Sequence, residues 1–205
     1  DGSDSAMVAK VGDIEFSSLA DTVAGIVSAA DKTGTVEIIG DVEMNERITV
    51  PDGADIKFTD DGAKHSITMA SATERQSQEA AFIIEQGGSL TIDGANLTFT
   101  RQAYNGGASG MIICHGKITL ENGTQNASCN SSTGGVKVCC NAKFIMNNGT
   151  IQNINGGSST RSGAVLVYAP NTSFEKGTAA FEMNGGTIKN NRGYRGAGVH
   201  VVGME

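Results

Sequence analysis

Carboxylates at matching positions of two similar segments are the first candidates for chemistry. Asp93 follows the run SLTI and Glu121 follows KITL, and Asn147 and Asn184 occupy the matching positions farther along. On strands about 4.8 Å apart, two such acids could serve as a retaining glycosidase pair or share a cation. Corner positions also favour Asp, Asn and Glu as turn residues, and two of the four positions carry no acid. We therefore predict no enzyme activity, no catalytic residue and no metal or cofactor site.

Histidines and cysteines offer no better catalytic or metal-binding pattern. His65, His115 and His200 stand in unrelated contexts and form no recognisable triad. The cysteines lack the paired spacing of a zinc site, and they are Cys114, Cys129, Cys139 and Cys140. Buried thiols are the main expectation. Four cysteines allow three pairings. A disulfide from Cys129 to Cys139 or Cys140 is the alternative, since Cys129 lies in the loop just before the strand that ends near Cys139 and Cys140.

Arginine and tyrosine side chains in loops are the better candidates for a binding site. The loop before each short valine-rich strand varies in length, so these loops should line one edge of the fold. Such loops are usual recognition sites, and Tyr and Arg are enriched at binding hot spots. Neighbouring outward strand positions would add an apolar patch. The predicted binding residues are Arg101, Tyr104, Ile113, Arg161, Leu166, Arg192, Tyr194 and Arg195. The alternative is that they are ordinary surface residues.

These candidate residues occur in a sequence that nearly repeats itself. FIMNNGTIQN (144–153) returns as FEMNGGTIKN (181–190), and each copy is followed by a Gly-rich loop and a valine strand. Weaker copies begin earlier, which aligns Leu90, Ile118, Phe144 and Phe181. Period-2 apolar runs between Asn-Gly corners predict strands, and their recurrence predicts an array. We predict an all-β fold, a right-handed parallel β-helix in which each coil lies on the previous one.

Strand alternation predicts which side chains point inward. The first two expected inner columns are Ile118, Phe144 and Phe181, and Leu120, Met146 and Met183. A third alignment joins the valine strands, through Ile112, Val136, Val165 and Val199. Asn153 and Asn190 occupy equivalent positions, where they could form an amide ladder or act only as turn residues.

The N-terminal segment has a different pattern. Residues 9–42 read strand, helix, strand, and Ser17 or Ser18 could cap a helix over 18–30 whose apolar face includes Leu19, Val23 and Ile26. An exposed end of a stacked fold needs a cover, which this helix would supply. We assign residues 1–45 to an N-terminal cap and 46–205 to coils, the first over 46–70. We also expect this chain to be a piece of a longer exported protein that continues beyond 205.

The repeat and the cap resemble a known family. The opening Val-Gly-Asp-x-x-Phe, the later Ile-Thr-Val-Pro-Asp-Gly and the Phe-x-Met-Asn-x-Gly-Thr-Ile repeat resemble β-helix domains of Gram-positive gut-bacterial surface proteins. The similarity to the wider pectate-lyase-like superfamily is in architecture only. The resemblance implies an extracellular, adhesin-like module that binds mucin, an immunoglobulin, another host glycoprotein or a glycan. A carbohydrate-active β-helix enzyme is the alternative, and a stalk that binds nothing is a third reading.

Charge and hydropathy exclude other classes of protein. Residues 1–61 hold 14 acidic and 4 basic residues, whereas residues 62–205 hold 8 and 11. A nucleic-acid binder should show a dense basic stripe, so no nucleic-acid partner is expected. No apolar run approaches the roughly 20 residues of a membrane helix, so direct membrane insertion is not expected. We expect a monomer.

Overall fold

The computed structural model describes residues 6–70, 80–102, 110–128, 134–155, 163–170 and 176–203. Within these ranges the strands form a 12-stranded and a 6-stranded sheet, and there is a single helix. Pairing is parallel throughout both sheets except at the N-terminal strands β1 and β2. The chain is therefore an all-β protein built mainly from parallel sheets.

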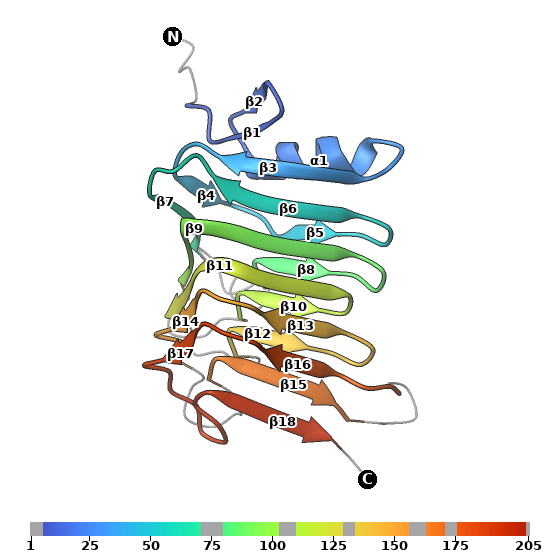
Figure 1. Ribbon diagram of the computed structural model, residues 1–205, viewed down its shortest axis with the longest axis vertical. Coiled ribbons are helices and arrows are strands. Elements are labelled where there is room, and N and C mark those ends of the chain that lie inside the picture. The colour runs from blue at the N-terminus through green and yellow to red at the C-terminus, as the bar shows by residue number, and fades with distance from the viewer. Residues whose placement is uncertain are drawn as a thin grey trace.

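The larger sheet consists of two rows of strands. The first row is β3 (Thr33–Ile38), β6 (Asp55–Asp60), β9 (Ser89–Gln102), β11 (Lys117–Ser128), β13 (Lys143–Met146) and β16 (Ala180–Met183). The second row adds β4 (Val42–Met44), β7 (His65–Ala70), β14 (Thr150–Gln152) and β17 (Thr187–Lys189). β9 and β11 are long enough to belong to both rows, and successive strands descend along the long axis (Figure 1).

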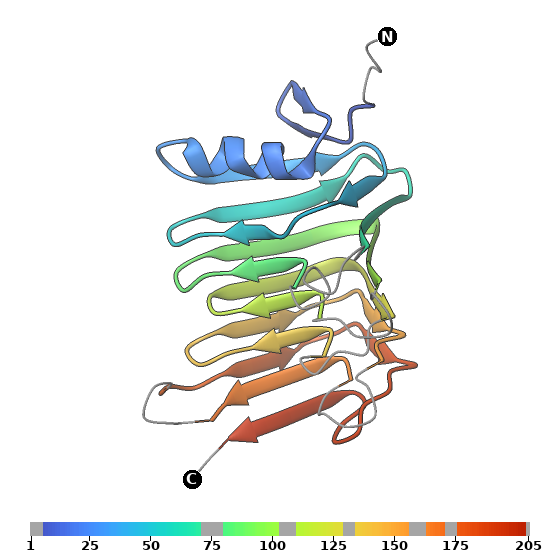
Figure 2. The ribbon, with the colours of Figure 1, turned by 180° about the vertical axis from the view of Figure 1, so that it is seen from behind.

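The smaller sheet takes one strand from each pass of the chain. Its strands are β5 (Ile48–Val50), β8 (Phe82–Ile84), β10 (Ile112–Cys114), β12 (Val136–Val138), β15 (Val165–Ala169) and β18 (Val199–Gly203). Seen from behind, they descend in chain order beside the larger sheet (Figure 2). The smaller sheet therefore grows in the same direction as the larger one.

The strand register confirms both repeat alignments made from the sequence. Leu90, Ile118, Phe144 and Phe181 are successive partners across β9, β11, β13 and β16. Ile112, Val136, Val165 and Val199 are successive partners across β10, β12, β15 and β18. A one-residue slip would have turned every apolar side chain outward, so the apolar period dictates this register.

Stacked aromatic and aliphatic side chains fill the interior. Phe58, Phe82 and Phe99 form one cluster with ring centroids 5.9–6.4 Å apart. Phe144 stacks on Phe181 at 4.9 Å. The expectation that Met183 is a core residue is wrong, because its side chain is 46% exposed. β16 is an edge strand with β13 as its neighbour, so no described strand covers Met183 from the other side.

The N-terminal segment covers one end of the sheets. β1 (Ala9–Val11) and β2 (Ile14–Phe16) form an antiparallel hairpin where one strand was expected, and α1 (Leu19–Ser28) follows. Ser18 is the N-cap, and its Oγ accepts a hydrogen bond from the Asp21 backbone N–H at 3.2 Å. Helix α1 lies across the end of the stacked strands (Figure 1). β3 and β4, inside the segment assigned to the cap, already pair in parallel with β6 and β7.

Gly34 shows why the strand after α1 begins as it does. A Cβ at this position would come within 2.8 Å of the Ile26 side chain. Ile26 is buried, together with Leu19 and Val23 on the same face of the helix. Glycine therefore lets the helix pack closely against β3.

The equivalent asparagines of the two clearest repeats are turn residues. Asn153 and Asn190 have φ angles of 57° and 54°, in the left-handed region that Asn tolerates better than most residues. Both are exposed. The structure gives no hydrogen bond between these two described residues, so the turn reading fits them and the ladder reading does not.

Candidate functional site

Hydrogen-bonded polar side chains run from strand to strand at one corner of the larger sheet. Lys57 Nζ lies 2.7 Å from Asp93 Oδ2, and Asn122 Nδ2 donates to Asp93 Oδ1 at 2.8 Å. Asn148 Nδ2 in turn donates to Asn122 Oδ1 at 2.9 Å. We call the residues Lys57, Asp93, Asn122 and Asn148 the first corner ladder.

A second corner ladder runs beside the first. Asn147 Nδ2 donates to Glu121 Oε1 at 2.9 Å, and Asn184 Nδ2 donates to Asn147 Oδ1 at 2.8 Å. Asn184 also donates to Glu182 Oε1 at 3.0 Å, and Lys143 Nζ lies 2.7 Å from Glu182 Oε2. An amide ladder therefore exists in this fold, at a different corner from the one considered for Asn153 and Asn190.

The two ladders separate the carboxylates that the sequence had aligned. A register shift between Leu120 and Asn122 places Asn122, not Glu121, opposite Asp93. The alignment of Asp93 with Glu121 was therefore wrong by one residue, because a bulge inserts an extra residue that sequence spacing does not reveal. Each carboxylate instead accepts from a strand neighbour in its own ladder.

Electrostatics at Asp93 agree with a structural role. The Lys57 ammonium, followed by the Asn122 amide, holds the pKa of the Asp93 carboxyl below its usual value. A general acid needs the opposite shift, toward neutral pH. This carboxyl therefore stays ionised and joins neighbouring strands.

Arg101 was expected in an exposed loop, and this expectation is wrong. β9 continues to Gln102, and its register places Arg101 opposite Met69, an inward position. The Arg101 side chain is fully buried, and Nη1 donates to the Met69 carbonyl at 3.2 Å. The side chain cannot reach a partner at the surface, because alternation along β9 carries it into the interior.

Ile113 lies on the outer face of the smaller sheet, as expected. Its neighbours on β10, Ile112 and Cys114, are buried, whereas Ile113 is half-buried. Register places it in a column that we call the outer column of the smaller sheet: Thr49, Ile83, Ile113, Lys137, Leu166 and His200. Ile83 and Lys137 were not among the predicted binding residues, although the alternation of FII and VKV could have identified them.

Leu166 belongs to the outer column but is not exposed. Its side chain is 2% exposed, so the expected exposure is wrong. Its column neighbours are Lys137 and His200, and long side chains of this kind cover apolar neighbours. Lys137 Nζ lies 4.5 Å from the Tyr168 ring centroid, a cation–π contact at the same strands.

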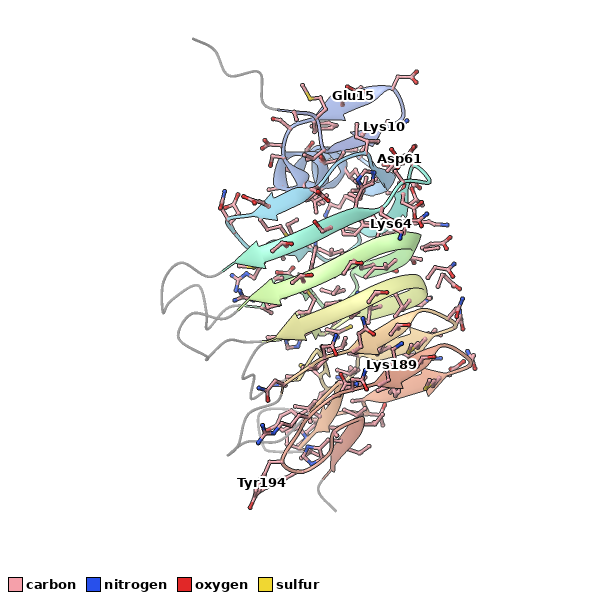
Figure 3. All side chains as sticks on the ribbon, turned by 90° about the vertical axis from the view of Figure 1, so that its left-hand side faces the viewer. Lys10, Glu15, Asp61, Lys64, Lys189 and Tyr194 are labelled. Carbon is pink, nitrogen blue, oxygen red and sulfur yellow. The ribbon has the colours of Figure 1, made fainter. Side chains whose placement is uncertain are left out.

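The remaining predicted residues fall in two groups. Arg192, Tyr194 and Arg195 are exposed between β17 and β18, and Tyr194 is 69% exposed. Tyr194 lies near the C-terminal end, far from Asp61 and Lys64 (Figure 3). Tyr104 and Arg161 lie outside the described residues. The structure thus places three of the predicted residues together in the segment between β17 and β18, whereas Ile113 lies on the outer face of the smaller sheet.

An open hollow lies between α1 and β5, above the outer column. Its volume is about 390 Å³. Small and apolar residues line most of it, namely Ala20, Val23, Ala24, Val27, Ile48, Thr49 and Pro51, and Glu46 and Arg47 complete the rim. Thr49 belongs to both the hollow and the outer column, so the two surfaces are continuous.

The cysteines described by the structure are thiols. Cys114 and Cys139 are buried and Cys140 is half-buried, which agrees with the main expectation. Burial raises the pKa of Cys114 to about 12. Cys129 lies outside the described residues, so the alternative disulfide stays untested.

The described ranges show neither a metal-binding cluster nor a membrane-spanning helix. There, no group of three or more His, Cys, Asp or Glu side chains could hold a metal ion. The ten-residue helix α1 is too short to cross a bilayer, and the same ranges contain no other helix.

Comparison with known proteins found no matching family model, no matching curated protein and no matching solved structure.

Proposed function

We propose that the chain is a right-handed parallel β-helix that serves as a non-enzymatic binding module, with its partner docking on the outer column of the smaller sheet. Two features support the β-helix assignment: the rows of in-register parallel strands and the helix α1 at one end of them. A rigid stack of this kind presents a surface with little ordering on binding, which favours affinity at modest area.

The observation that carries the proposal is the apolar character of the outer column. Ile83 and Ile113 are adjacent, half-buried and outward-facing, and they continue upward through Thr49 to the hollow beside α1. Below them, Lys137 and Tyr168 add a cation and an aromatic ring. An apolar centre with a polar rim is the composition expected of a protein-binding surface.

The outward residues of the larger sheet are more polar than those of the smaller sheet. One of its outward columns consists of hydroxyl residues, Ser66, Thr98, Thr124, Thr150 and Thr187. Another outward column consists of Thr35, Lys57, Thr91, Thr119, Ile145 and Glu182, of which Ile145 alone is apolar. Apolar outward residues are therefore concentrated on the smaller sheet, which favours that sheet as the docking face.

The proposed partner is a host glycoprotein, such as a mucin or an immunoglobulin, met at the outside of a bacterial cell. The resemblance of the repeats to surface proteins of gut bacteria supports this part of the proposal. The exposed Arg192, Tyr194 and Arg195 connection lies next to β18 and would contact the edge of the same partner. Arginine offers forked donors to carboxylates and sulfates, which such partners carry.

The test is a binding screen followed by matched variants. The purified protein is applied to immobilised mucins, immunoglobulins and a glycan array. Ile113→Asp and Ile83→Asp should weaken binding to the retained partner by about tenfold or more, as expected for a hot spot. Thr91→Asp on the larger sheet is the control and should bind normally. Retained affinity in both isoleucine variants, or no bound partner in the screen, would contradict the proposal.

A further inference from the structure

Gln125 is a polar side chain in an interior column that is otherwise apolar. It lies on β11 between Phe99 of β9 and Ile151 of β14, and the same column continues to Ile67 and Ile188. The side chain is 1% exposed. Strand alternation therefore carries an amide into the stacked core.

Neither polar atom of this amide has a hydrogen-bond partner in the described part of the chain. Both Nε2 and Oε1 of Gln125 are buried and unbonded there. Buried polar groups in folded proteins are almost always hydrogen-bonded, either to protein or to ordered water. A single molecule can satisfy both atoms of this amide if it accepts from Nε2 and donates to Oε1.

A second polar side chain enters the same interior from the neighbouring strand. Arg101 is fully buried and lies two residues beyond Phe99, the strand partner of Gln125. Diagonal positions of this kind are within reach of long side chains. The residue opposite Arg101 on β11 is Ala127. A guanidinium in an apolar core is costly to bury, so polar surroundings favour its position.

We propose that the Gln125 amide binds an internal water molecule between β9 and β11, on the same interior face as Arg101. Water supplies both a donor and an acceptor, as Oε1 and Nε2 require. A water molecule is stable in a protein interior where polar groups surround it. The site is separate from the outer column, since Gln125 points into the core and Ile113 points away from it.

The experiment measures contacts between water and the glutamine side-chain amides in isotope-labelled wild-type protein. Nuclear Overhauser and rotating-frame cross-peaks of opposite sign from water to the Gln125 Nε2 protons are expected, since opposite signs report a long-lived contact. Gln152 of β14 is the matched control, because it occupies an outward position in the next layer. Its amide should show short-lived contacts only.

Water-oxygen relaxation dispersion gives an independent count of long-lived internal waters. Gln125→Met keeps the size of the side chain and removes both polar atoms, so the variant should hold fewer long-lived waters than wild type. An unchanged count in a folded Gln125→Met protein would overturn the proposal. So would the absence of long-lived contacts at the Gln125 amide in wild type, a measurement that does not depend on the variant folding.

Discussion

At the residue scale, side-chain direction decides whether a position serves the core or the surface. Phe144 is fully buried, whereas its partner Phe181 is only partly buried because β16 is an edge strand. The same residue type in the same column therefore has two different environments. Direction also explains Arg101, whose residue type suggested exposure and whose strand position places it in the interior. Leu166 differs, because it is buried although it faces outward.

Replacing the two stacked phenylalanines tests this difference. Phe144→Ala should lower the free energy of unfolding by about 3–5 kcal/mol, because it removes a buried ring and leaves a cavity. Phe181→Ala should lower it clearly less, since the ring at 181 already contacts solvent. Urea unfolding of both variants measures the two values. Equal losses would show that the edge strand is covered in solution.

At the element scale, the alternation of apolar residues and the turn residues between them predicted most of the strands. Alternating apolar residues in the repeats predicted the strand partners, and both alignments are confirmed. The bulge beyond Leu120 was not predictable, because an extra residue in one strand leaves the apolar pattern on either side intact. For the candidate site, the outward direction of Ile113 and Leu166 was predictable from alternation, whereas the burial of Leu166 was not, because alternation gives a side chain's direction and not what covers it.

The cap of α1 is the sharpest element-scale prediction. The sequence left Ser17 and Ser18 as alternatives, and the structure identifies Ser18 through its bond from the Asp21 N–H. Ser18→Ala should destabilise the protein by about 1 kcal/mol, the usual value for a lost N-cap. Ser17→Ala is the control and should be nearly silent, because Ser17 is exposed and precedes the cap. Comparable losses in the two variants would contradict the assignment.

At the scale of the whole molecule, carboxylates join neighbouring strands at several corners. Asp41 accepts from the Ser66 N–H and Oγ at 2.7 and 2.9 Å, and these bonds lower its pKa. Partial burial alone would raise the pKa of Asp60, but hydrogen bonds from the Asn96 backbone and side chain outweigh it, and the pKa is lowered. Lys57 and Asn122 lower the pKa of Asp93. Ionised carboxylates thus connect the turn before β4 to β7, β6 to β9 and β9 to β11.

These three shifts predict acid destabilisation of the whole stack. A carboxyl whose pKa is below its usual value of 3.8 binds fewer protons in the folded chain than in the unfolded chain. Its stabilisation is therefore complete above pH 3.8 and is lost as the pH falls through the lower folded value. The melting temperature should fall steeply below about pH 4. Asp93→Asn should lower stability at neutral pH and make the acid decline shallower, because the substituted side chain no longer takes up a proton. A melting temperature that stays constant from neutral pH to pH 2, or an equally steep decline in Asp93→Asn, would show that these carboxylates do not hold the layers together.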